Sequence, residues 1–255
     1  MFNWFSRWRS RRIIARSTIS TEQWQSAFSQ LPVLNRLTTN EKQRLKDLAV
    51  LFLYEKSIEG ARGCIVDDAM RLLIALQACL PVLKLDLSWY KGWVSVIVYP
   101  GAFLTEQKFI DESGVVHTTN QALGGEAWLR GPVILAWDDT AHAGYIDGQN
   151  LVIHEFAHKL DMMNGVANGF PPLHSNINKH EWSEVFSAAF SDFRKNLHNK
   201  RRAGIDHYGA TNPGEFFAVL SEVFFEMPQV IHQYYPSVYD NLVLFYRQNP
   251  LETGV

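Results

Sequence analysis

The hydrophobic and polar positions in the first third of the chain repeat with the period of helices. Apolar residues recur every three or four positions in three stretches, which begin near residues 21, 39 and 67. Hydroxyl or carboxyl side chains stand at or beside each start and suit helix caps. Pro81 ends the third stretch, because proline cannot continue a helix. Residues 20–87 are therefore predicted to form a helical N-terminal part.

From residue 88 the pattern changes to the two-residue period of strands. The strand-like stretches are residues 93–99, 108–110, 115–117 and 132–137. A polar turn at residues 111–114 joins the second and third of them into a predicted hairpin. We expect a small mixed or antiparallel sheet directly before residue 150, with an edge on which an extended peptide can lie as an added strand.

The helical period returns after this sheet. Residues 150–163 contain neither Pro nor Gly and predict a half-buried helix, which a polar loop at residues 164–178 follows. Further helices are predicted at residues 179–197, 213–226 and 237–248. The fold class is therefore α+β. The expected divisions are a basic aromatic segment at 1–20, a helical part at 21–87, the sheet with its following helix at 88–165, and a helical subdomain at 166–255.

The helix at residues 150–163 carries the pattern H-E-x-x-H. His154 and His158 lie one turn apart on the same face, so both imidazoles can bind one Zn²⁺. Glu155 lies beside them and can take a proton from a metal-bound water. The alternative is a helix whose two histidines hydrogen-bond within the core. A chance match to the pattern H-E-x-x-H falls in a loop as readily as in a helix, so its position in an apolar helix favours the zinc site.

Catalytic zinc usually takes a third protein ligand. A histidine six residues after the motif is excluded, because the positions of the required Gly and His hold Asp161 and Asn164. Glu215 and Glu222 lie seven residues apart on one helix face, so one can bind the metal while the other orients a ligand histidine. Asp206 is the alternative ligand. We rank Glu215 first and Asp206 second, with Glu222 and Asp161 as supports of the ligands.

Four stretches of the chain carry a resemblance to a known family. They are HEFAHKLD at 154–161, YGATNPGEFFA at 208–218, GPVILAW at 131–137 and MRLLIA at 70–75. In these stretches the chain resembles the Mlc titration factor A family, which is in turn similar to the catalytic domain of anthrax lethal factor. The similarity covers most of the chain beyond residue 20.

The resemblance implies a zincin-like zinc metallopeptidase that holds one Zn²⁺ per chain through His154, His158 and Glu215. It also implies that Glu155 is the general base. Tyr208 precedes the third ligand by seven residues, as in both groups of proteins, and is implied to lie near the oxyanion. Aminopeptidase-type activity on peptides and binding of Mlc, a repressor of sugar-uptake genes, are further implications. The alternative is a repressor-sequestering protein whose zinc site is not needed for capture.

Composition narrows the class of protein. The chain has 255 residues, of which 47% are hydrophobic and 20% charged, and its net charge is −2, so no direct nucleic-acid partner is expected. No secretory signal is visible, and the longest apolar run, residues 72–83, is too short to span a bilayer. Cys64 and Cys79 are expected in one helical stretch as buried free thiols. These features predict a cytoplasmic protein.

The first residues differ from the rest in charge. Residues 1–21 carry five Arg and no acid, with Phe and Trp interleaved. Such a segment can rest on an anionic membrane or on another acidic partner. Most chain ends, however, are frayed and solvated, and we favour that interpretation for this one.

Overall fold

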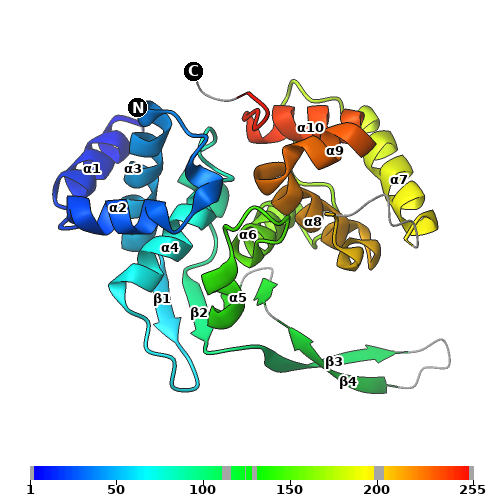
Figure 1. Ribbon diagram of the computed structural model, residues 1–255, viewed down its shortest axis with the longest axis horizontal. Coiled ribbons are helices and arrows are strands. Elements are labelled where there is room, and N and C mark those ends of the chain that lie inside the picture. The colour runs from blue at the N-terminus through cyan, green and yellow to red at the C-terminus, as the bar shows by residue number, and fades with distance from the viewer. Residues whose placement is uncertain (1–2, 111–115, 124, 128–130, 198–203, 253–255) are drawn as a thin grey trace.

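A computed structural model describes residues 3–110, 116–123, 125–127, 131–197 and 204–252. The N-terminal helices lie on one side, the C-terminal helices lie on the other, and the motif helix α6 lies between them (Figure 1). The helices are α1 (Asn3–Ala15), α2 (Thr21–Ser29), α3 (Thr39–Glu55), α4 (Asp68–Cys79), α5 (Trp137–His142), α6 (Leu151–Asp161), α7 (Lys179–Lys195), α8 (Pro213–Glu226), α9 (Pro228–Tyr234) and α10 (Pro236–Tyr246). The predicted α+β class is confirmed.

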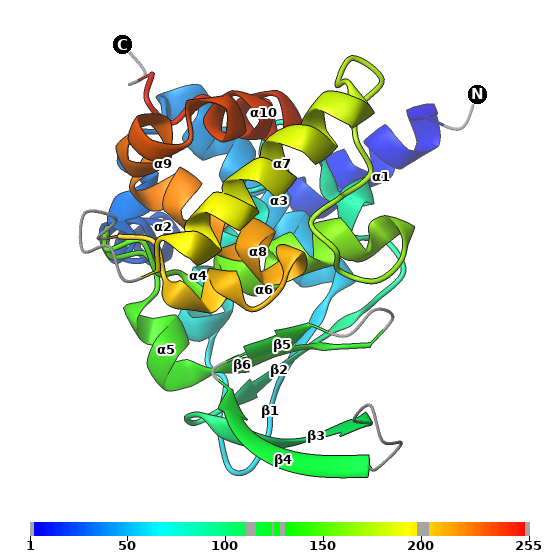
Figure 2. The same ribbon diagram turned by 90° about the vertical axis from the view of Figure 1, so that its right-hand side faces the viewer.

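A four-stranded mixed sheet lies beneath α6 and α8 (Figure 2). Its strands, in spatial order, are β1 (Ser57–Gly60), β2 (Ser95–Tyr99), β6 (Val133–Ala136) and β5 (Gly125–Ala127). The first three strands are parallel, whereas β5 pairs antiparallel with β6 and forms the edge nearest to α6. The predicted hairpin is present as β3 (Phe103–Ile110) and β4 (Val116–Leu123), and its predicted turn at 111–114 lies outside the described residues.

Two local predictions for the sheet were wrong. Strand β1 lies inside the N-terminal part that was predicted to be helical. Only Ile58 of its four residues is buried, so its sequence shows no alternation of apolar and polar residues. The last strand was predicted at residues 132–137, but β6 ends at Ala136, and Trp137, Asp138 and Asp139 form the first turn of α5. Carboxylates suit that position because the amino end of a helix carries partial positive charge.

The helix α6 was predicted at 150–163, and its inner face explains its position. Val152, Ile153, Phe156 and Leu160 are fully buried. The ring of Phe156 lies 5.1–5.6 Å, between centroids, from the rings of three aromatic residues of the N-terminal half, namely Phe52, Tyr90 and Trp93. Aromatic contacts at this separation fix the motif helix firmly against the core.

The helix α8 has the bounds that the sequence predicted. Pro213 occupies its first turn, and the side chain of Asn212 caps it by accepting a hydrogen bond from the backbone N–H of Glu215 at 3.0 Å. Nearly all of α8 is buried, because α6 lies on one side of it and α7 and α10 on others. The cap and the burial together bring Glu215 to the face of α6 that carries the motif.

Other differences from the sequence predictions lie away from the site. Residues Asn3–Ala15 form helix α1 beside α3, so the interpretation as a frayed end was wrong. Cys79 is a buried free thiol as predicted, but Cys64 precedes α4 and is only partly buried.

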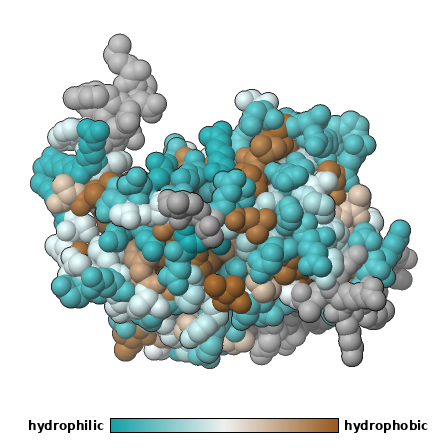
Figure 3. All heavy atoms as spheres, turned by 45° about the horizontal axis from the view of Figure 1, so that its top comes forward, coloured by the Kyte–Doolittle hydropathy of each residue, from teal (hydrophilic) through white to brown (hydrophobic). Residues whose placement is uncertain are grey.

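Hydrophobic side chains reach the face shown in Figure 3 in small patches between hydrophilic ones. No helix within the described part of the chain is long and apolar enough to cross a membrane.

Candidate metal site

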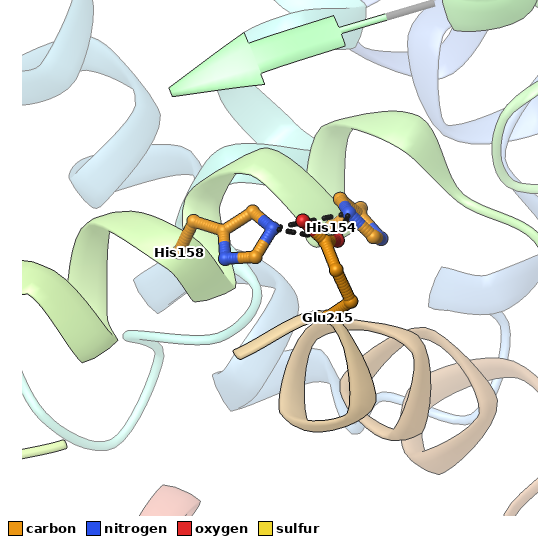
Figure 4. Close-up of side chains that lie close together, drawn as sticks. All are labelled: His154, His158 and Glu215. Carbon is orange, nitrogen blue, oxygen red and sulfur yellow. Dashed lines mark hydrogen bonds and ion pairs between the residues drawn. The ribbon is translucent and has the colours of Figure 1, made fainter. Parts of the chain in front are cut away.

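Three side chains converge where α6 faces the start of α8 (Figure 4). His154 Nε2 lies 3.0 Å and His158 Nε2 lies 3.1 Å from Glu215 Oε2, and the two Nε2 atoms are 3.2 Å apart. Tetrahedral zinc, with bonds of roughly 2.0–2.2 Å, holds its N and O ligand atoms about 3.3–3.5 Å apart. The three donors therefore have both the chemistry and nearly the spacing that a zinc ion needs.

Glu222 fixes the orientation of His154. Its Oε1 lies 2.7 Å from His154 Nδ1, and its other oxygen accepts a hydrogen bond from the backbone N–H of Asn150. With Nδ1 held by a carboxylate, Nε2 of the same ring is turned toward Glu215. A carboxylate behind a histidine in this way sets the tautomer and the ring orientation of a metal ligand.

Asn150 connects this pair to a buried polar network. Its Oδ1 accepts from Ile153 N at 2.9 Å and so caps α6, while its Nδ2 lies 2.9 Å from both Gln77 Oε1 and Glu226 Oε1. Glu226 also accepts a hydrogen bond from Gly148 N at 3.0 Å. The network ties α4, the start of α6 and the end of α8 together directly behind His154.

The cluster has unusual electrostatics. Burial opposes a charge on His154, but the carboxylates of Glu222 and Glu215 raise the pKa of its imidazole well above the ordinary value. Burial alone would raise the pKa of Glu215, yet its hydrogen bonds to His154 and His158 lower that pKa to about 2. A cation is therefore favoured at the point where these groups meet, and a metal ion would compete there with a proton.

Asp161 was predicted to support the metal ligands, and the structure places it one turn beyond them. Its Oδ2 accepts hydrogen bonds from the backbone N–H groups of Asn168 at 2.8 Å and Gly169 at 2.7 Å. Within the described residues, Asp161 Oδ1 and His158 Nδ1 have no hydrogen-bond partner. Asp161 therefore anchors the loop after the motif helix, and burial raises its pKa to about 6.

Glu155 lies between the metal ligands and the sheet edge, and only 3% of it is exposed. A Cβ atom at Gly125 of β5 would lie 2.4 Å from Glu155 Oε1. The glycine thus leaves the space that the carboxylate occupies. The motif helix and the edge strand meet at this contact, so any group lying along β5 is brought beside Glu155.

Tyr208 belongs to the short 3₁₀ helix His207–Ala210, and Asp206 caps the start of that helix. The ring of Tyr208 lies 6.0 Å from that of His154, between centroids, and burial together with the charges of Glu215 and Glu155 raises the pKa of its hydroxyl to about 12. Asp206 Oδ1 accepts a hydrogen bond from the backbone N–H of Tyr208 at 2.8 Å. Among the described residues, the group that can hold a metal contains Glu215 and not Asp206.

These residues open into a cleft of about 630 Å³. Carboxylates line it from the metal ligands to the rim, where Asp139, Asp147 and Asp206 stand. No Lys or Arg is among the lining residues that the structure describes. The cleft therefore presents a negative field, which attracts cationic groups.

Three residues behind the ligands, Asn150, Glu226 and Gln77, were not predicted as part of the site. Asn150 carried a usable signal, because an Asn directly before an apolar helical stretch is a preferred cap. Glu226 follows Glu222 by four residues and so lies on the same face of α8. Gln77 carried no signal, since an isolated polar residue in an apolar helix does not reveal its partner.

The chain matches known proteins over most of its length. The model of the family described as "Glucose-regulated metallo-peptidase M90" matches residues 5–247. The proteins named Mlc titration factor A from Escherichia fergusonii and Salmonella typhi are 39% and 38% identical to it over 233 and 232 residues. Each alignment covers 89% of this chain and 86% of the relative.

A third relative agrees with these two. Mlc titration factor A from Escherichia coli is 37% identical over 231 residues, which are 90% of this chain and 87% of the relative. The family match begins at residue 5, whereas the resemblance in the sequence motifs covers only residues beyond 20. The chain therefore belongs to the glucose-regulated metallo-peptidase M90 family.

Proposed function

We propose that the protein is a zinc-dependent peptidase of the aminopeptidase type. The observation that carries the proposal is the convergence of His154 Nε2, His158 Nε2 and Glu215 Oε2 within 3.2 Å of one another. Two imidazoles and a carboxylate are a common ligand set of catalytic zinc, with a further position left for water or substrate. When bound, zinc would supply a Lewis acid. This Lewis acid would polarise a substrate carbonyl and lower the pKa of a bound water to about 7.

Glu155 is the proposed general base. It lies beside the ligands and against β5, within reach of a water that attacks a peptide held at the sheet edge. It would take the proton of that water and return it to the departing amine, a transfer that contributes typically 10²–10⁴-fold in rate. Its burial keeps bulk water from competing for that proton.

Tyr208 is the proposed oxyanion donor. Because its pKa is raised to about 12, its hydroxyl keeps its proton at neutral pH and can donate it in a hydrogen bond. About 2.7–4 kcal/mol of transition-state stabilisation is typical of one such donor. Tyr208 lines the cleft and 38% of its surface is exposed, which supports a contact between its hydroxyl and a substrate bound there.

The cleft supports a substrate that enters by its amino end. A peptide can pair with the free edge of β5 and extend toward the ligands. Its α-ammonium group would then lie among carboxylates such as Asp139, Asp147 and Asp206, with no described cationic side chain to repel it. Aminoacyl p-nitroanilides with a free amino group should therefore be cleaved faster than the same compounds N-acetylated.

The substitution Glu155→Gln tests the chemistry. The variant should bind zinc as the parent does, because no metal ligand is changed, and should lose at least about 10²-fold in kcat. Zinc content is measured by metal analysis and turnover with a p-nitroanilide. Parental turnover by the zinc-loaded variant would contradict the assignment of Glu155, and a parent without zinc-dependent turnover would contradict the peptidase.

A second proposed function is binding of an Mlc-type repressor, which would place the protein in the cytoplasm. The names of its relatives, Mlc titration factor A, support it. Capture of a repressor needs a docking surface and not a hydrolytic centre. The same Glu155→Gln variant separates the two functions, because it should still bind the repressor if capture is independent of catalysis.

A further inference from the structure

A groove between α1 and α3 is separate from the metal site. Its volume is about 590 Å³, and it shares no lining residue with the metal cleft. The two helices lie side by side in the N-terminal half of the molecule (Figure 1). The lining residues are Trp8, Arg9, Arg12, Ile13, Arg16, Ser17, Thr18, Ile19, Val50, Leu53 and Tyr54.

The groove is basic. Arg9, Arg12 and Arg16 line it, no Asp or Glu is among its described lining residues, and these arginines make no ion pair within the described part of the chain. The guanidinium of Arg9 lies 5.8 Å from the ring centroid of Tyr54, and that of Arg12 lies 5.5 Å from Trp8. Stacking on a ring holds a guanidinium in place while its N–H groups still point outward to an acceptor.

The groove is also partly apolar. Four half-buried side chains, Ile13, Ile19, Val50 and Leu53, contribute its aliphatic surface. Trp8 is 53% exposed and Tyr54 58% exposed. Trp, Tyr and Arg are the residues most enriched among the energetic centres of protein interfaces, where an aromatic ring and a paired charge are buried together. The matching ligand carries both carboxylates and apolar side chains.

We propose that this groove docks an acidic segment of a protein partner. The proposal rests on the repressor-binding half of the proposed function, and the segment is assigned to the Mlc-type repressor. A membrane surface fits less well, because helices that lie on membranes place basic and apolar residues on opposite faces. In α1 the arginines share the groove with Trp8 and Ile13, and a concave surface suits a projecting segment.

The test replaces Arg9, Arg12 and Arg16 with Glu together. The control replaces three exposed lysines elsewhere, Lys91, Lys179 and Lys195, with Glu, so that both variants change the net charge equally. Affinity for the purified repressor is measured by calorimetry at low and high salt. Peptide turnover and circular dichroism are measured on the same preparations.

The arginine variant should lose about 100-fold or more in affinity for the repressor, while the lysine variant stays within about threefold. Both should keep parental turnover, because neither changes the metal cleft. Parental binding should also weaken as salt rises.

Three outcomes would overturn the proposal. Equal binding by the parent and the arginine variant would place the repressor elsewhere and leave repressor binding standing. If the parent does not bind the repressor, both the docking site and the repressor-binding function are contradicted, and the proposed peptidase activity is unaffected. Vesicles containing phosphatidylglycerol that bind the parent and not the arginine variant, with repressor binding unchanged, would assign the groove to a membrane.

Discussion

Replacing Asn150 with Ala should disturb both the stability of the protein and its metal site. The side chain caps α6 through Ile153 N, and its Nδ2 donates to Gln77 Oε1 and Glu226 Oε1, each at 2.9 Å. Alanine keeps the backbone N–H that donates to Glu222 and the backbone C=O that accepts a hydrogen bond from His154 N at 2.9 Å. The substitution therefore removes three hydrogen bonds from a fully buried position while leaving every proposed metal ligand in place.

The expected loss follows from these contacts. A lost helix cap costs about 1 kcal/mol. Gln77 Oε1 and Glu226 Oε1 lose a buried donor, which costs about 1–3 kcal/mol more. The free energy of unfolding should fall by about 2–4 kcal/mol. Because Glu222 orients His154 from the same network, zinc affinity should fall roughly 10–100-fold.

Urea unfolding measures the first quantity and titration with a competing chelator the second. The matched control is Asn178→Ala, because Asn178 caps α7 in the same way at an exposed position, accepting from His180 N and Glu181 N. It should cost about 1 kcal/mol and leave zinc affinity unchanged. A loss for Asn150→Ala no larger than this, with parental zinc affinity, would refute the positioning role of the network.

Three further outcomes are expected. Burial raises the pKa of Glu226 from 4.5 to about 7, so the folded state favours the protonated carboxyl group. The free energy of unfolding should therefore be highest below pH 4.5 and should fall by about 3 kcal/mol as the pH rises from 4.5 to 7. Glu226→Gln should flatten the urea-unfolding stability across that range, and an unchanged slope would contradict this. Gly125→Ala should displace Glu155, because Glu155 Oε1 would lie 2.4 Å from the new Cβ. The variant should keep its zinc content and lose about 10²-fold in kcat, and parental turnover would argue against that contact. Removing zinc with a chelator should lower the free energy of unfolding by about 4 kcal/mol relative to zinc at 1,000 times its Kd, and an unchanged melting temperature would speak against a bound metal.

Local patterns predicted those elements whose signals lie within one segment. The motif helix and α8 were predicted because each has a long apolar period with a capping residue before it. Strand β1 and helix α9 were missed, since four and seven residues respectively are too few to show a period. Cys64 was predicted in the same helical stretch as Cys79, but the side chain of Asp67 caps α4, so the helix begins after Cys64.

The sequence by itself determined the pairing of His154 with His158. Residues four apart on a helix share a face whatever surrounds them, because the backbone fixes 3.6 residues per turn. Only the tertiary structure decided that Glu215, and not Asp206, meets them, and that Glu222 and Asn150 stand behind. Those contacts join segments about sixty residues or more apart, and the burial of α6 against α8 sets their distances, which no local pattern encodes.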